Sequence, residues 1–364
     1  MTPTEYMNRV KESNSTAFDN QVKSLKILVV TNMYPSSEYP YYGIFVKQQV
    51  DSLKKNGILV DVFFINGREN RLQYFSSIIS LYRKLRSGRY DIIHAHHTYC
   101  VYPILICRIL TKTRIASVLT FHEGEVYKTR DTTSKKVGMI KRCVYLKSIK
   151  KIAANNVDLV IPVEERLMDK INFKGRTVVL PCGVDMDIFQ PRNKTMCRKR
   201  LKLPLDKKIL FFPAAPEPKG QKGYDIVREA LRLTFRNDVV LVASRNIPHE
   251  DMPYYMCAAD VIVQASQFEA SPMVIKEAMA CNVPVVSTDV GDVRKIIGDT
   301  EGCYVCRRDA RDIADKIEKA LVFNAATKGR ERILSLGLGL EQVSAKIGKA
   351  YEELTGYQSE EDKN

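Results

Sequence analysis

The stretch FEASPMVIKEAMACNVPVVST, residues 268–288, joins an apolar helix-like segment to an apolar run typical of a buried strand. Serine often caps a helix and proline favours its first position, so Ser271 and Pro272 predict a helix start. The helix is expected to run to about Cys281 and to end at Asn282. A helix followed by a buried strand is part of the repeating unit of an α/β fold.

Two glutamates lie in this stretch, eight positions apart. Glu269 precedes the expected helix, and Glu277 lies roughly 8–9 Å along its axis. A carboxylate in an otherwise apolar segment needs a partner, because an unpaired buried charge is costly. The first N–H groups of the helix suit a diphosphate, and carboxylates on either side suit sugar hydroxyls. The stretch therefore predicts a nucleotide-sugar site, with a salt bridge from Glu277 to a nearby lysine or arginine as the alternative.

Short apolar runs alternate with helical patterns along the chain, which predicts parallel sheets. A first series of strands is expected at residues 26–31, 58–64, 91–96, 115–122, 157–163 and 177–181. A second series is expected at residues 209–213, 238–243, 260–265, 283–288 and 303–307. The predicted fold is α/β, with two doubly wound parallel-sheet Rossmann-like domains facing a cleft.

Changes in this pattern set the predicted domain boundaries. The predicted segments are a mobile leader at 1–24, an N-terminal acceptor-side domain at 25–190, a Gly-, Pro- and Lys-rich linker at 191–208, and a C-terminal nucleotide-sugar-binding domain at 209–338. A last helix at 339–356 is expected to pack back on the N-terminal domain, before a tail at 357–364. No apolar stretch is long enough to predict a spanning helix.

The composition of the 364 residues limits the partners and the compartment. Nine cysteines without pairing logic, and no signal-like apolar core, indicate reduced thiols in the cytoplasm. The net charge of +15 favours anionic partners. Basic helices near 80–90 and 134–155 interleave aliphatic residues, which fits either a solvated face or peripheral contact with the anionic inner face of a membrane. No nucleic acid partner is expected, because stacking aromatics are few in these runs.

Several short motifs contain residues that are able to bind phosphate or metal. The loop PEPKGQKG, residues 216–223, supplies Lys219 and Lys222 to neutralise phosphates, although it is not a P-loop. The CYVC run at 303–306, the DMD run at 185–187 and the histidines 94, 96 and 97 favour structural roles over metal binding. The loop residues Arg245 and His249 suit either a base pocket or the surface.

With these residues in place, the chain resembles the retaining nucleotide-sugar glycosyltransferases of the two-Rossmann-domain (GT-B) class, family four in particular. The resemblance extends from about residue 26 to residue 354. Its most specific element is the E-x7-E motif formed by Glu269 and Glu277. Supporting segments are YYGIFVKQQVDSLKKNG, DIIHAH, LTFHEGE, LPCGVD and KGYDIVREAL.

The resemblance implies roles for individual residues. Glu277 is expected to hold the donor ribose, Glu269 the donor sugar near the reacting centre, and His122 to lie beside the transferred sugar and the acceptor. The other donor contacts that it implies are Gly43, Lys219, Lys222, Ala270, Ser271, Pro272 and Met273. The leaving diphosphate helps to deprotonate the acceptor in this scheme, so catalysis is mainly positioning and charge stabilisation. No cofactor and no essential metal are expected.

Three positions depart from the family pattern. Alanine replaces the usual glycine at position 270, which would cost about 1 kcal/mol or more if the backbone there needed a positive φ. The lysine loop lacks the family's frequent arginine, and HEGE replaces the commoner His-Gly-x-Asp, which leaves Glu123 and Glu125 without assigned roles. The leading interpretation is a retaining hexosyltransferase that uses UDP- or GDP-sugar and a glycan or lipid-linked acceptor. The alternative is a non-catalytic protein that binds nucleotide sugar or an anionic surface.

Overall fold

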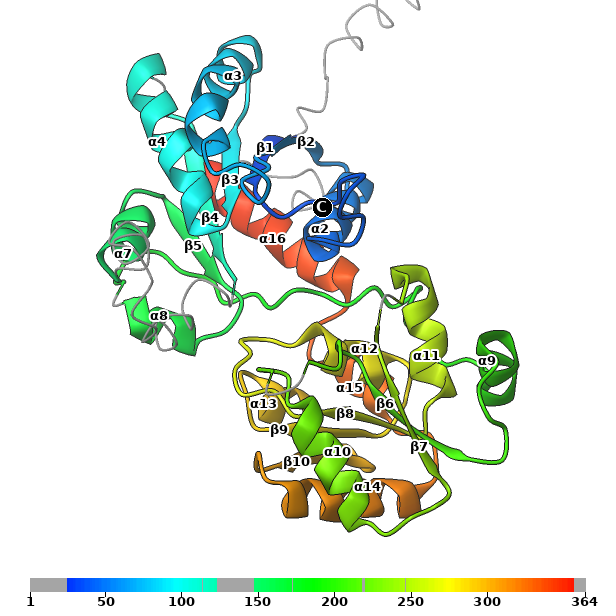
Figure 1. Cartoon of the computed structure of the whole chain (residues 1–364). Helices are drawn as coiled ribbons and strands as arrows, with labels where there is room; N and C mark the ends of the chain where they lie inside the picture. Colours follow the sequence, from blue (N-terminus) through cyan, green and yellow to red (C-terminus); the bar gives the residue numbers. More distant parts are fainter. Residues whose placement is uncertain are drawn as a thin grey trace, which may run out of the picture.

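The computed structural model describes residues 25–112, 114–122, 147–171, 173–217, 220–245 and 247–356. These residues form two five-stranded parallel sheets, each covered by helices on both faces (Figure 1). The arrangement confirms the predicted α/β fold with two Rossmann-like domains. None of the helices in the described ranges is long and apolar enough to cross a membrane.

The N-terminal sheet has the strand order β2-β1-β3-β4-β5. Its strands are β1 (Lys26–Thr31), β2 (Leu59–Phe64), β3 (Ile92–His96), β4 (Ala116–Phe121) and β5 (Leu159–Pro162). Alternate residues of β1 face opposite clusters, with Ile27 on one side and Leu28 on the other. Both faces are buried, which explains why the strands are continuous apolar runs in the sequence.

Helices cover both faces of this sheet. The elements on one face are α2 (Ile44–Lys55) and α16 (Leu340–Thr355), and those of the other side are α3 (Gln73–Ser87), α4 (Thr98–Thr111), α7 (Lys147–Asn155) and α8 (Arg166–Ile171). The C-terminal helix α16 therefore completes the N-terminal core. Its Tyr351 is fully buried, and the hydroxyl lies 2.6 Å from Nδ1 of His94 in β3.

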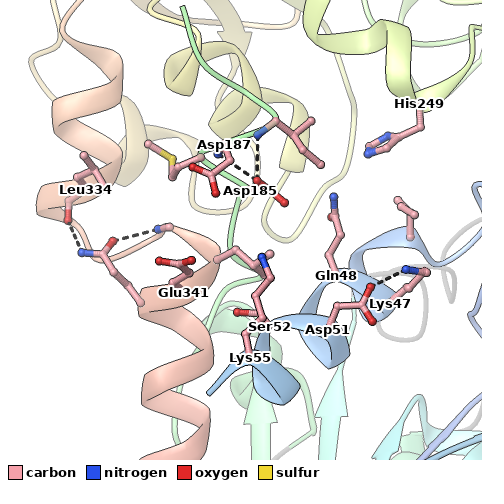
Figure 2. Close-up of a pocket in the computed structure, with 16 residues that line it drawn as sticks. Lys47, Gln48, Asp51, Ser52, Lys55, Asp185, Asp187, His249, Leu334 and Glu341 are labelled. Carbon is pink, nitrogen blue, oxygen red and sulfur yellow. Dashed lines mark hydrogen bonds and ion pairs between the residues drawn. The ribbon is translucent and has the colours of Figure 1, made fainter. Parts of the chain in front are cut away.

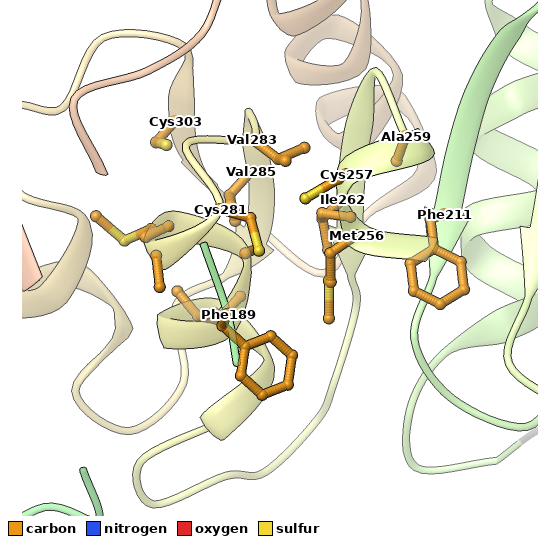
Figure 3. Packing of buried hydrophobic residues seen from close by; sticks show 14 of the residues in the cluster. Phe189, Phe211, Met256, Cys257, Ala259, Ile262, Cys281, Val283, Val285 and Cys303 are labelled. Carbon is orange, nitrogen blue, oxygen red and sulfur yellow. The ribbon is translucent and has the colours of Figure 1, made fainter. Parts of the chain in front are cut away.

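The C-terminal sheet has the strand order β10-β9-β8-β6-β7. Its strands are β6 (Lys208–Phe212), β7 (Val239–Ala243), β8 (Val261–Gln264), β9 (Val285–Thr288) and β10 (Cys303–Cys306). The covering elements are α9 (Lys194–Leu201), α10 (Tyr224–Leu233), η1 (His249–Asp251), α11 (Met252–Ala258), α12 (Met273–Ala280), α13 (Val293–Ile297), α14 (Ala310–Phe323) and α15 (Gly329–Ser335). Figure 3 shows the core on one face, where Phe211 of β6 and Ile262 of β8 belong to the same apolar cluster as Met256 of α11.

Two sequence predictions differ from the structure. The strand expected at 177–181 is only an isolated bridge from Thr177 to Val160, although its backbone continues beside β5 through Leu180. The expected linker at 191–208 contains α9, capped by Asn193, whose side chain accepts a bond from the Met196 N–H. The sequence did not predict this helix because its residues are mainly basic and form no apolar stripe. Only one cysteine and one arginine of the helix are buried.

The two domains are joined where two chain segments run side by side. Val184 forms a parallel bridge with Gly339, and the Leu340 N–H donates to the Val184 carbonyl at 2.8 Å. A Cβ on Gly183 would lie 2.6 Å from the Leu340 Cα, so only glycine allows this close approach. The backbone passes twice between the domains at this point, which is called the hinge below.

Candidate active site

Helix α12 begins two residues later than Ser271, with Pro272 in the N-cap position. Ser271 does not cap it, because its hydroxyl donates to Asp292 at 2.7 Å. The helix ends at Ala280, and Asn282 adopts a left-handed φ of 58°. Met273 is its first residue, so the N–H groups predicted to bind a diphosphate do lie at a helix start.

Glu269 is held rigidly beside this helix start. It is only 6% exposed, and its Oε1 accepts bonds from Ser266 at 2.8 Å and from Gln264 at 3.2 Å. Lys222 also forms an ion pair with the same oxygen. In this structure, then, Lys222 pairs with Glu269, and any phosphate would share that ammonium group with the carboxylate.

The side-chain carboxylate of Glu277 has no hydrogen bond and no ion pair with any residue that the structure describes. The salt bridge considered as the alternative is therefore absent from the described part of the chain. Burial raises the pKa of this carboxyl from its ordinary 4.5 to about 7, and the neighbouring Lys276 ammonium only partly opposes the rise. A half-buried carboxylate without a protein partner is an unusual feature that invites a hydrogen-bonding ligand.

Ala270 fits its place without backbone strain. It is fully buried and is not among the described residues with a positive φ. The strain of about 1 kcal/mol that alanine would cause at a positive φ is therefore absent. Its methyl group packs in the cluster of the N-terminal sheet, together with Val163 and Cys182. The segment that follows Glu269 therefore touches both domains.

The glycine of the N-terminal loop is required by its surroundings. Gly43 has a φ of 71° and precedes α2, and a Cβ there would overlap the Met33 carbonyl. Two residues on, the Phe45 ring lies 5.0 Å from the His122 ring, centroid to centroid. The loop of Gly43 and the end of β4 are thus brought together.

His122 belongs to a buried group of histidines. Its Nε2 lies 3.2 Å from Nδ1 of His96, and its Nδ1 faces the Cys182 sulfur at 4.0 Å. Burial lowers the pKa of His122 to about 4, so the ring is neutral near pH 7. The partners of His94 and His96 are thus other side chains of the N-terminal domain, which agrees with strand-end packing.

Lys276 was missed by sequence reasoning and connects the two halves of the site. Its side chain is fully buried, and its Nζ lies 2.6 Å from the Cys182 carbonyl and 3.1 Å from the Ser271 hydroxyl. Burial lowers the pKa of this lysine. The sequence does contain a signal for this residue. Lys276 directly precedes the second glutamate of E-x7-E and stands in an otherwise apolar segment, where a lysine needs a partner.

Two further contacts close the domains against each other. Arg166 of α8 donates to the Gly291 carbonyl, and the Tyr41 hydroxyl lies 3.1 Å from Glu250. Burial raises the pKa of Asp292, which follows Gly291 and accepts the Ser271 hydroxyl. Lys219, Glu123 and Glu125 lie outside the described residues.

Two cavities flank the hinge. One of 380 Å³ lies between α2, the 185–188 turn and the start of α16, with His249 above it (Figure 2). Another of 1030 Å³ is bounded by Glu164, Asp292 and Lys346. Among the residues considered for the donor, only His249, a candidate for a base pocket, lines either of these two cavities.

The DMD and CYVC motifs make local turn bonds and core contacts. Oδ1 of Asp185 accepts the N–H groups of Asp187 and Ile188 at 3.0 Å, as in a turn. Cys303 and Cys306 pack in different clusters, as expected for strand positions three apart. Within the described ranges, no group of three His, Cys, Asp or Glu side chains is placed to hold an ion.

Comparisons with known proteins agree with this architecture. The profile described as "Glycosyltransferase Family 4" matches residues 25–188, and "Glycosyl transferases group 1" matches residues 216–322. A Bacillus subtilis glycosyltransferase named for teichuronic acid biosynthesis, TuaC, is 23% identical over 81% of this chain and 89% of its own length.

Solved structures show the same fold. The sucrose-phosphate synthase of Thermosynechococcus elongatus superposes with a TM-score of 0.70 at 18% identity, covering 92% of this chain and 100% of its own. HepE of Anabaena, solved with UDP, gives 0.65 at 16% identity, covering 90% and 100%. The family profiles and the fold together define a GT-B glycosyltransferase. The chain belongs to glycosyltransferases of the family 4 type.

Proposed function

We propose that this glycosyltransferase moves a hexose, with retention of configuration, from UDP- or GDP-sugar to a glycan or lipid-linked acceptor. The observation that carries the proposal is the unpaired carboxylate of Glu277, one turn inside the helix whose first N–H groups suit a diphosphate. Support also comes from HepE, which was solved with UDP-glucose, and from the name of TuaC. The process served is synthesis of a surface polysaccharide or glycolipid.

The donor would be held by three kinds of group. Glu277 accepts the ribose hydroxyls, and Glu269 accepts a hydroxyl of the transferred sugar. Between them, the backbone N–H groups of Ala270, Ser271 and Met273 hold the diphosphate together with Lys222, and Pro272, which has no N–H, contacts it only by packing. Lys219 and Gly43 approach from two loops. Lys222 already neutralises Glu269, so the ammonium group is positioned before the donor arrives.

Catalysis in this proposal is chiefly positioning and stabilisation of the leaving diphosphate. The leaving phosphate takes the acceptor proton on the face from which it departs. His122 is neutral near pH 7 and is held by His96, so it orients substrate through packing and hydrogen bonds rather than by charge. The scheme needs no cofactor and no essential metal.

The proposed location is the cytoplasm, at the inner face of a membrane. Two basic regions were expected to make that contact, near 80–90 and 134–155. Most of the second lies outside the described residues, and Lys150 within it is buried, so it adds nothing to the surface. In the first region, Leu81 and Leu85 of α3 are buried, whereas the basic residues Arg83, Arg86 and Arg89 are exposed.

Calorimetry with UDP-, GDP- and ADP-sugars, followed by a hydrolysis assay, tests the proposal. Wild-type protein should bind one nucleotide sugar and hydrolyse it slowly, whereas Glu277→Gln should bind it at least tenfold more weakly. The matched control is Glu301→Gln, an exposed carboxylate remote from the site. Binding without any transfer or hydrolysis would favour the non-catalytic alternative, and equal affinity in wild type and Glu277→Gln would reject the site.

A further inference from the structure

Exposed apolar side chains gather on two neighbouring helices of the N-terminal domain. Of the sixteen large apolar residues that are exposed in the described part of the chain, six belong to α3, α4 or the residue before α3. They are Leu72, Phe75, Ile79, Ile106, Ile109 and Leu110. Phe75 and Ile109 are the most exposed of the six, at 72% and 76%.

The spacing of these residues puts them on the outer faces of the helices. Positions 72, 75 and 79 are three and four apart, so they form one stripe along α3. Positions 106, 109 and 110 do the same on α4. The two helices pack directly on each other. At their contact, the Cys107 thiol of α4 donates to the Ile78 carbonyl of α3 at 3.4 Å. Figure 1 shows them side by side, at the end of the molecule away from the C-terminal sheet.

The same helices are basic and lack acidic residues. Residues 71–90 and 98–115 contain eight lysines and arginines and no aspartate or glutamate. Asp61 and Asp158, from adjacent strands or loops, pair with Lys84 and Arg108. The other six basic residues are exposed, and none has an ion pair within the described part of the chain: Arg71, Arg83, Arg86, Arg89, Lys112 and Arg114.

Helices that lie in a lipid interface typically combine an apolar stripe with lysines and arginines that have no acidic partner in the protein. A soluble partner with an apolar patch would not require six free cations, whereas anionic headgroups neutralise them. We propose that the outer face of α3 and α4 docks on a membrane that contains anionic lipid, with Phe75, Ile79 and Ile109 entering the headgroup boundary.

This docking rests on the membrane location already proposed for the 80–90 region of α3, and it adds the apolar stripes and the basic residues of α4. Glycosyl transfer gives the docking a purpose, namely access to a lipid-linked acceptor. Docking itself needs neither donor nor acceptor. The surface also differs from the site, since no donor residue lies on α3 or α4. Failure of docking and failure of glycosyl transfer are therefore separate outcomes.

Sedimentation with vesicles of phosphatidylcholine, with and without phosphatidylglycerol, tests the proposal. Wild-type protein should bind only the anionic vesicles, and added salt should weaken binding. The Phe75→Ser/Ile79→Ser variant should bind at least tenfold more weakly, and each of Arg83→Gln and Arg86→Gln about fivefold more weakly. The control is Phe235→Ser/Val322→Ser, which alters two equally exposed side chains on the other domain and should bind as wild type does.

Thermal melting and circular dichroism establish that each variant is folded before binding is compared. The proposal is overturned if wild-type protein ignores anionic vesicles, or if the Phe75→Ser/Ile79→Ser variant binds them as tightly as wild type. It is also overturned if wild type is a dimer that this variant converts to a monomer while neither form sediments with vesicles. The face would then be an interface between two copies of the chain.

Discussion

Replacing Glu277 by glutamine should stabilise the free protein while it removes donor affinity. The carboxylate has no partner among the described residues, and burial raises its pKa to about 7. In the folded state it therefore keeps its proton up to about pH 7, whereas in the unfolded chain it loses the proton near pH 4.5. Stability falls as the pH rises through this window, and the full penalty persists above it.

The size of the penalty follows from these two pKa values. A rise from 4.5 to about 7 corresponds to at most about 3 kcal/mol at pH 8. The side chain keeps some contact with solvent, which reduces the expected gain from glutamine to about 2 kcal/mol. At pH 5 the gain should fall below about 1 kcal/mol, since the unfolded carboxyl is then only partly ionised.

Urea denaturation of wild type, Glu277→Gln and Glu301→Gln at pH 8 and pH 5 measures these differences. Glu301→Gln should stay within about 0.5 kcal/mol of wild type at both values. Calorimetry with the preferred nucleotide sugar should show at least a tenfold loss for Glu277→Gln alone. If glutamine destabilises the protein at pH 8, or if its effect does not depend on pH, Glu277 has a structural partner and the reasoning is refuted.

Four other outcomes are expected. Gly43→Ala should lose about 2–3 kcal/mol of unfolding free energy, because the new Cβ overlaps the Met33 carbonyl at a positive φ; a normal urea midpoint would contradict this. Ala270→Gly should cost about 1 kcal/mol and leave kcat unchanged, since position 270 has no positive φ to relieve. Tyr351→Phe should cost about 1–2 kcal/mol by removing the hydroxyl bound to buried His94, with no loss of donor affinity in calorimetry. Titrating from pH 8 to pH 6 should weaken donor binding by wild type but leave the residual affinity of Glu277→Gln unchanged, because only a carboxylate titrates near 7.

Much of the fold was predictable because parallel strands are buried on both faces. Ten of the eleven expected strands are present, and each is a short apolar run. The exception, at 177–181, has the same composition but only follows the edge of β5. Helix α9 was missed for the opposite reason, because Arg198 supplies much of its buried surface by bonding Asp260 at 2.6 Å.

Local sequence located the start of α12 to within two residues, yet it could not give the links between the two halves of the site. Lys276 and Cys182 are far apart in the chain, and their contact depends on how the domains close. The pairing of Lys222 with Glu269 also joins two loops of the C-terminal sheet. Such contacts leave no periodic signal, since they follow from tertiary packing alone.

The return of α16 to the first sheet has a consequence for synthesis of the chain. The ribosome makes the N-terminal strands first, but one face of their core is covered only by α2 until Val343, Ile347 and Tyr351 of α16 emerge. In topological terms, the C-terminal domain is an insertion within the N-terminal one. A nascent chain must therefore hold an unfinished first domain while the second one folds. A fragment cut at the hinge would expose an apolar surface that the whole protein hides.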